Sequence, residues 1–82
     1  MGTYSISRLE QLSGIKAHTI RIWEQRYKIF TPKRSAGNVR YYDDNQLRKL
    51  LNIVSLSNDG IRVSELCRMS QKDLNLLLER QI

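Results

Sequence analysis

Two short amphipathic helix patterns lie next to each other near the start of the chain, and a glycine separates them. The first pattern begins at Ser7, which makes with Glu10 the S-x-x-E spacing typical of a helix N-cap, and it turns its apolar residues toward one side. Gly14 then supplies the residue type at which helices commonly end. The segment is predicted to be a short helix that stops at this glycine.

The second pattern begins near Lys16 or Ala17 and runs to about Tyr27, because Ile20, Trp23 and Tyr27 recur at the spacing of one helical face. Two short helices joined by a few residues that include a glycine are typical of a helix-turn-helix. The first third of the chain is therefore predicted to fold as this motif, with the outer face of the second helix left in solvent.

Helical periodicity stops between residues 30 and 42, where a β-hairpin is predicted. Pro32 ends a helix, and residues 35–38 are a run of turn-forming residue types between two short polar and aromatic strands. A hairpin that directly follows a helix-turn-helix is a candidate wing. The predicted fold class is mainly α with a small β-hairpin, a winged helix-turn-helix.

Three more helical segments are predicted after the hairpin. Asp43 or Asp44 caps the first, which ends at residues 58–60 and whose apolar stripe comprises Leu47, Leu50, Leu51 and Val54. The next is a short helix that carries Val63, Leu66 and Cys67. Ser70 and Asp73 then form a new cap, followed by Leu74, Leu77 and Leu78.

The last apolar stripe has no remaining sequence to bury it, which indicates either a fragment or a helix that pairs with another copy. We favour the fragment. The expected domains are a winged helix-turn-helix over residues 1–70 and the start of a truncated C-terminal helix, a dimerisation or linker element, over residues 71–82.

Charge is distributed very unevenly along the chain. Between Lys16 and Arg40 there are seven basic residues and one acid, Glu24, whereas after Arg40 six basic residues offset six acids. The whole net charge of +6 therefore lies in one contiguous third of the sequence. Such segregation favours a polyanionic partner, and nucleic acid before a membrane surface.

Composition gives little support to other classes of protein. Cys67 and His18 make no zinc ligand set, so we expect no metal and no cofactor in this fragment, and Cys67 is predicted to be a small buried residue. No phosphate loop, acid pair or nucleophile with a base is present, so no enzyme is expected. No apolar run approaches the ~20 residues that span a bilayer, and residues 1–7 lack signal-peptide features, so we expect a soluble, cytoplasmic, nucleoid-associated protein with no membrane partner.

The outer face of the second helix carries side chains that can read base edges. Counting about 100° per residue from the buried face turns His18, Ile22 and Gln25 outward, with Arg21 and Arg26 at the sides. Arginine can span two acceptors of guanine, glutamine can pair with adenine, and isoleucine can touch a thymine methyl group. Sequence-specific readout of the major groove is the function these residue types favour.

Other residues are candidates for phosphate contacts. Lys16, His18 and Thr19 lie near a helix N-terminus, where free amides and the helix dipole favour an anion. Glu24 is expected to brace Lys28, or an arginine of the wing, rather than to accept from cytosine.

The wing supplies a second set of candidates. Arg34 and Arg40, supported by Lys33, are expected to contact phosphate or a minor-groove edge. A period of two places Arg40 and Tyr42 on one face of the strand and Val39 and Tyr41 on the other. Tyr42 is expected to pack on the core, whereas Tyr41 could instead offer its hydroxyl to a phosphate oxygen.

Several stretches in this order resemble the N-terminal domain of MerR-family regulators. They are Tyr4-Ser-Ile, Leu9-Glu-Gln-Leu-Ser-Gly-Ile15, Thr19-Ile-Arg-Ile-Trp-Glu-Gln-Arg-Tyr27, Pro32-Lys-Arg34 and Asn38-Val-Arg-Tyr-Tyr-Asp43. Most of the family reads T-I-R-Y-Y-E in the second helix, whereas the form T-x-R-x-W-E-x-R-Y found here is similar to the light-sensing or cobalamin-binding branch related to the LitR and CarH regulators. Lys28 stands where that branch often has glycine.

The resemblance implies a bacterial transcription regulator that binds a pseudo-palindromic operator as a homodimer, with the second helix in the major groove and the wing beside it. It carries the family arginines over to Arg21 and Arg40, and the branch residues to Arg26 and Tyr27. A C-terminal sensor domain would decide between activation and repression, and no such domain lies within these 82 residues.

Two alternatives remain from the sequence. A winged-helix adaptor would bind another protein, but a protein partner gives no reason to concentrate the excess charge between residues 16 and 40. An excisionase-like architectural protein would bend DNA without regulating a promoter. RNA binding is weaker still, because the aromatic residues are expected to pack in the core rather than to form a base-stacking platform.

Overall fold

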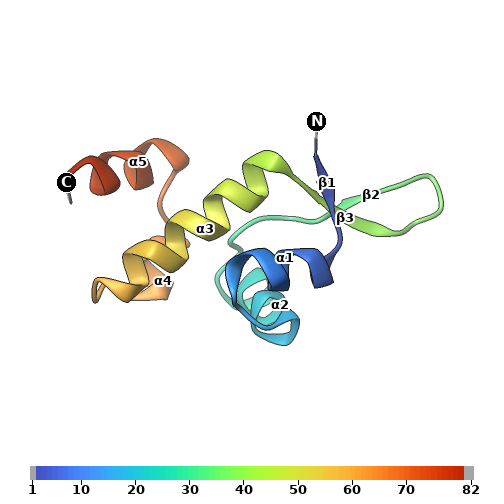
Figure 1. The fold of residues 1–82 in the computed structure, drawn as a ribbon, viewed down its shortest axis with the longest axis horizontal. Helices are drawn as coiled ribbons and strands as arrows, with labels where there is room; N and C mark the ends of the chain where they lie inside the picture. Colours follow the sequence, from blue (N-terminus) through green and yellow to red (C-terminus); the bar gives the residue numbers. More distant parts are fainter. Residues whose placement is uncertain (1, 81–82) are drawn as a thin grey trace.

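The computed structural model describes residues 2–80, and Figure 1 shows a helical body from which a hairpin projects to one side. The helices are α1 (Ile6–Ser13), α2 (Ala17–Arg26), α3 (Asp44–Asn58), α4 (Val63–Leu66) and α5 (Gln71–Arg80), and the strands are β1 (Thr3–Tyr4), β2 (Lys33–Arg34) and β3 (Arg40–Asp43). The predicted fold class, mainly α with a small β-hairpin, is confirmed. The hairpin and α5 lie at opposite ends of the molecule (Figure 1).

The first two helices form the predicted helix-turn-helix, but the cap predicted at Ser7 is wrong. Ser5 is the N-cap of α1, and its Oγ accepts a hydrogen bond from the Arg8 backbone N–H at 3.1 Å. The Glu10 carboxylate accepts instead from the Ala17 backbone N–H at 2.7 Å, so it satisfies an amide at the start of α2. Glu10 thus bonds to an amide seven residues away instead of capping its own helix, and no local sequence pattern indicates this contact. The predicted glycine end is confirmed, with a φ of 77°.

A strand that no sequence pattern indicated extends the hairpin into a three-stranded antiparallel sheet. β1 pairs with β3, which places Thr3 opposite Asp43 and Tyr4 opposite Tyr42, and the strand order is β1-β3-β2. The Tyr4 hydroxyl also donates to Asp44 Oδ1 at 2.6 Å. These contacts fasten the start of the chain to the junction between the wing and α3.

The central helix of the body is α3, which begins at the predicted cap. Asp43 accepts from the Gln46 backbone N–H at 2.8 Å, and the Gln46 side chain accepts from the Asp43 backbone N–H at 2.9 Å. The fully buried residues of α3 are Leu50, Ile53 and Leu56. The predicted stripe was wrong at Leu51, which is 39% exposed, because the face of α3 that is buried against the other helices contains Ile53 instead.

At the C-terminal end, α5 packs against α3 and buries Leu74 completely. The expectation that the last apolar stripe would find no cover within the chain is therefore wrong for Leu74, although Leu76 is 48% exposed. The predicted Ser70 cap is confirmed, since its Oγ accepts from the Asp73 backbone N–H at 3.2 Å. The division between residues 1–70 and 71–82 stays a prediction, and residues 81–82 lie outside the described part of the chain.

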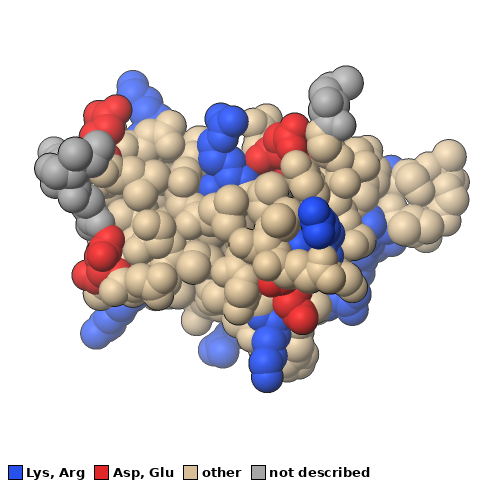
Figure 2. Space-filling model, viewed as in Figure 1, with Lys and Arg blue, Asp and Glu red and all other residues tan. Residues whose placement is uncertain are grey.

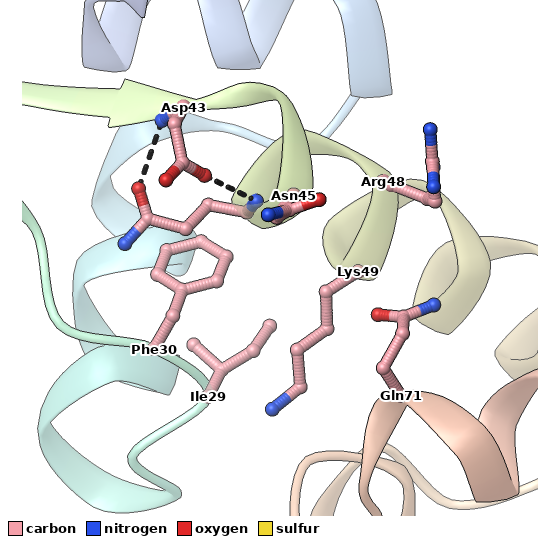
Figure 3. Close-up of a pocket in the computed structure, with 8 residues that line it drawn as sticks. Ile29, Phe30, Asp43, Asn45, Arg48, Lys49 and Gln71 are labelled. Carbon is pink, nitrogen blue, oxygen red and sulfur yellow. Dashed lines mark hydrogen bonds between the residues drawn. The ribbon is translucent and has the colours of Figure 1, made fainter.

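A surface hollow of about 570 Å³ lies where the start of α5 approaches α3 and the connection from α2 to β2 (Figure 3). Ile29 and Phe30 supply its apolar side, and Figure 3 shows the Lys49 side chain reaching toward Ile29. The remaining lining residues are Asp43 at the end of β3, residues in the N-terminal half of α3, and Gln71. The hollow contains none of the residues predicted to contact a partner, so it is separate from the candidate interface.

Candidate nucleic-acid interface

The outer face of α2 is open to solvent, as predicted. The exposed candidates are Lys16, His18, Arg21, Gln25 and Arg26, and the half-buried ones are Thr19, Ile22 and Tyr27. Ile20 on the opposite side is fully buried, whereas Trp23 is half-buried and packs against the core. The helix therefore uses one face for packing and leaves the other face, including two arginines, available for contacts.

The hairpin brings Arg40 beside Arg21, although 18 residues separate them in the sequence. Both arginines line a hollow of about 220 Å³ between α2, β3 and the segment before β2. Both also line a second hollow of about 310 Å³, together with Ser5 and Ile6 at the start of α1. Figure 2 shows lysine and arginine side chains along the lower margin, beneath α2 and the hairpin. We call the exposed side of α2 together with Arg40 and the adjoining hairpin the α2–wing surface.

A partly buried hydrogen bond joins the two parts of this surface. The Tyr42 hydroxyl donates to Glu24 Oε1 at 2.6 Å, which joins β3 to α2. Burial raises the pKa of the Glu24 carboxyl above 4.5, while the hydrogen bond from Tyr42 and the charges of Arg40 and Arg21 act in the other direction. Burial and the hydrogen bond to Glu24 raise the pKa of the Tyr42 hydroxyl. The expected partner of Glu24 was Lys28 or a wing arginine, so its role in holding Tyr42 was missed.

The turn between α2 and the wing has a strained backbone. Lys28 has a φ of 52°, a left-handed conformation that favours glycine, and it follows Tyr27, the C-cap of α2. The turn places Ile29 fully in the core and Phe30 edge-on against Tyr42, with ring centroids 5.5 Å apart. Although position 28 holds lysine where the related branch often has glycine, its backbone adopts the left-handed conformation that glycine favours.

The remaining wing candidates do not all face the same way. Lys33 forms an ion pair with Asp43 at 2.8 Å. The Arg34 guanidinium donates to the side chain of Asn38 at 3.3 Å, at the tip of the hairpin. Tyr41 lines a hollow with Thr3, Ser35 and Val39, on the face of the strand opposite Tyr42. Arg40 therefore lies with α2, whereas Tyr41 lies on the outer face of the sheet.

The described residues offer little support for metal binding, thiol chemistry or a membrane-spanning helix. Residues 2–80 hold no group of three or more histidine, cysteine or acidic side chains that a metal ion would need. Cys67 is buried as predicted, and burial raises the pKa of its thiol to about 11. Within the same range no helix has the length and apolar character that a membrane crossing requires.

Comparison with known proteins decides the family. Residues 4–73 match the family described as MerR HTH family regulatory protein. The chain belongs to the MerR family. It is 33% identical over 67 residues to the HTH-type transcriptional repressor CarH of Myxococcus xanthus, an alignment that covers 82% of this chain and 22% of that protein. It is 36% identical over 64 residues to the HTH-type transcriptional regulator CueR of Bacillus subtilis, covering 78% of this chain and 44% of that protein.

Solved structures agree with this assignment. HiNmlR, a MerR family regulator lacking the sensor domain and crystallised bound to promoter DNA, matches with a TM-score of 0.61 and 25% identity over 98% of this chain and 55% of its own. A MerR family regulator from Bacillus cereus matches in fold with a TM-score of 0.72 and 17% identity, over 98% of this chain and 63% of its own. The winged helix-turn-helix fold predicted from the sequence is confirmed, and the chain spans less than half of the two curated relatives.

Proposed function

We propose that this chain binds double-stranded promoter or operator DNA in a sequence-specific way, with α2 in the major groove and the wing on the adjacent backbone or minor groove. The observation that carries the proposal is that Arg21 on α2 and Arg40 on β3 line the same hollow of the α2–wing surface. An arginine on a recognition helix can pair with guanine, and an arginine on a wing can neutralise a phosphate. HiNmlR, which has the same fold, was crystallised on promoter DNA.

Charge and exposure support the same function. The excess charge of the chain lies between Lys16 and Arg40, the segment that builds α2 and most of the hairpin. Lys16, the N-cap of α2, makes no side-chain hydrogen bond to the helix, but the Glu10 carboxylate already accepts from the Ala17 backbone N–H. We therefore expect the exposed side chains of Lys16 and His18, rather than that amide, to contact phosphate at the start of the helix. Binding is therefore expected to combine base contacts from α2 with phosphate contacts from the helix start and the wing.

We propose that the protein acts as a homodimer on an inverted repeat, because one such domain covers only one half-site and a linked second copy would add the contacts to the other half-site. A role on DNA would place it with the nucleoid in the cytoplasm. The proposal includes no enzymatic activity and no cofactor bound by this chain.

The first test is selection of bound duplexes from a random DNA pool, at two salt concentrations, for the wild type and for Arg21→Ala and Arg40→Ala. Arg68→Ala is the matched control, since Arg68 is an exposed arginine near α4. We expect one half-site motif to be recovered, lost with Arg21→Ala, weakened over all sequences with Arg40→Ala and retained with Arg68→Ala. If about six basic residues neutralise phosphates, log affinity should fall against log salt with a slope of about −5.

Two other outcomes would favour the alternative hypotheses, a protein-binding adaptor or an architectural DNA-binding protein. If no motif emerges and neither arginine changes the retained DNA, the basic segment is only a charged surface, and a protein-binding adaptor becomes the better explanation. Strong DNA bending without any motif would instead favour an excisionase-like architectural role.

A further inference from the structure

Glu24 is the one acid between Lys16 and Arg40, and it lies in the hollow that the proposed DNA contacts share. A carboxylate at this position opposes phosphate binding, so a purely electrostatic surface would be stronger without it. Its side chain is half-buried and its Oε1 accepts from the Tyr42 hydroxyl at 2.6 Å. The charge is therefore held in place by a rigid contact rather than left to move in solvent.

The two arginines flank this carboxylate without closing on it. Arg21 and Arg40 line the hollow together with Glu24, and the charges of both act on the carboxylate. Neither forms an ion pair with Glu24 in the described part of the chain, where Lys33 and Asp43 do pair. The Tyr42 hydroxyl occupies Oε1, and both Arg21 and Arg40 are exposed, so their guanidinium groups can donate to a bound partner.

We propose that Glu24, fixed by Tyr42, is a specificity-determining residue that positions Arg21 and Arg40 for operator contacts and repels phosphate from the hollow that they line. The inference rests on the proposed DNA-binding function. A fixed negative charge disfavours every duplex whose backbone would enter the hollow, while a cognate site that pairs both arginines with their own targets offsets that cost. Specificity then comes partly from a repulsive element.

Two substitutions separate the charge from the hydrogen bond. Glu24→Gln removes the charge and keeps an oxygen that accepts from Tyr42, so the fold is retained. Tyr42→Phe keeps the charge and removes its fixed partner, which frees the carboxylate to capture an arginine. Glu65→Gln makes the same charge change on α4 and serves as the matched control, because Glu65 is exposed and lies outside the α2–wing surface.

The measurement is the affinity of each variant for the selected duplex and for a scrambled duplex of equal length, together with its midpoint of urea unfolding. Glu24→Gln is expected to bind the scrambled duplex about fivefold more tightly and to lose about tenfold in the ratio of the two affinities, because a repulsive element has been removed. Tyr42→Phe should lower selected-duplex affinity with little change on scrambled DNA. The double variant should match Glu24→Gln, since the two residues act as one unit.

The outcomes distinguish the two proposals. If the wild type discriminates between the duplexes and Glu24→Gln keeps both its stability and its affinity ratio, the role of Glu24 is refuted while the DNA-binding function stands. If Glu24→Gln and Glu65→Gln change the ratio equally, only net charge matters, and the inference is likewise overturned. If the wild type shows no preference for any duplex, the proposed function fails and this inference fails with it.

Discussion

The half of the molecule that contains α2 and the wing differs from the half that contains α3, α4 and α5 in its charge and in its buried apolar residues. Residues 16–40 carry an excess charge of +6, whereas the residues after Arg40 have equal numbers of acids and bases. α2 has one fully buried residue and no side-chain cap, while α3 has three fully buried residues and a complete capping box. The α2–wing half therefore carries the excess of basic side chains, and the α3–α5 half carries more of the buried apolar side chains.

This difference indicates that stability and recognition are largely separated in the fold. Repulsion among the basic residues weakens the compact state of the half that carries them, so a neutral, well-packed half must compensate. The halves are linked by one shared core, since Ile20 and Ile29 lie in the same buried cluster as Leu50. The hydrogen bond from Tyr42 to Glu24 adds a polar contact to this link. Substitutions on either side of this link should therefore affect different measurements.

The largest effect is expected from Leu50→Ala in the α3 core. Leu50 is fully buried, so truncation should lower the free energy of unfolding by about 3 kcal/mol through lost burial and the cavity left behind. Urea unfolding followed by circular dichroism measures the change. Leu51→Ala is the control, because Leu51 is 39% exposed and should cost much less. Equal losses in both variants would contradict the assignment of α3 as the stabilising half.

A smaller effect is expected at the junction of the two halves, from Asp43→Ala. Loss of the side-chain acceptor for the Gln46 amide should cost about 1–2 kcal/mol, the usual range for an N-cap replaced by alanine. Asp43→Asn keeps the cap and removes the ion pair with Lys33, so it should cost much less. Thermal unfolding compares the two, and an equal loss in both variants would mean that the ion pair, not the cap, holds the junction.

The strained turn in the recognition half gives a change of opposite sign. Lys28 has a φ of 52°, and glycine adopts this conformation without steric cost, so Lys28→Gly should raise the free energy of unfolding by about 0.5–1 kcal/mol. Lys28→Ala removes the same charge and keeps the strain, which isolates the backbone contribution. The glycine and alanine variants should lose DNA affinity equally. A glycine variant no more stable than alanine would mean that the turn relaxes in solution.

The features predicted from the sequence are those that local patterns determine. A cap at Asp43 or Asp44 was predicted from the local pattern, and Asp43 is the cap; the outer face of α2 followed from helical periodicity alone. β1 was missed because a two-residue strand has no detectable period. The contact between Glu24 and Tyr42 was missed because it joins residues 18 apart, and only the packed hairpin brings them together. Sequence thus predicted the surfaces, whereas the tertiary link between them required the structure.

The smallest effect concerns pH, and the two halves should respond with opposite sign. The ion pair with Lys33, then the Gln46 amide, lowers the pKa of Asp43 below 3.8, so its contribution to stability is present above pH 3.8 and is lost as pH falls through the lowered value. Burial raises the pKa of Glu24 above 4.5, so the folded state takes up a proton more readily there, and stability is lost as pH rises from 4.5 through the raised value.

Urea unfolding at stepwise pH can separate these contributions. Glu24→Gln should remove the loss of stability above pH 4.5, while Asp43→Asn, which retains the cap, should flatten the loss at more acidic pH. Both changes are expected to be small, since Lys33 is 52% exposed and solvent screens its pairing with Asp43. If Glu24→Gln made the protein less stable above pH 4.5, the arginines, rather than burial, would dominate the environment of Glu24. The recognition half would then be stabilised by the same acid that we propose restrains its binding.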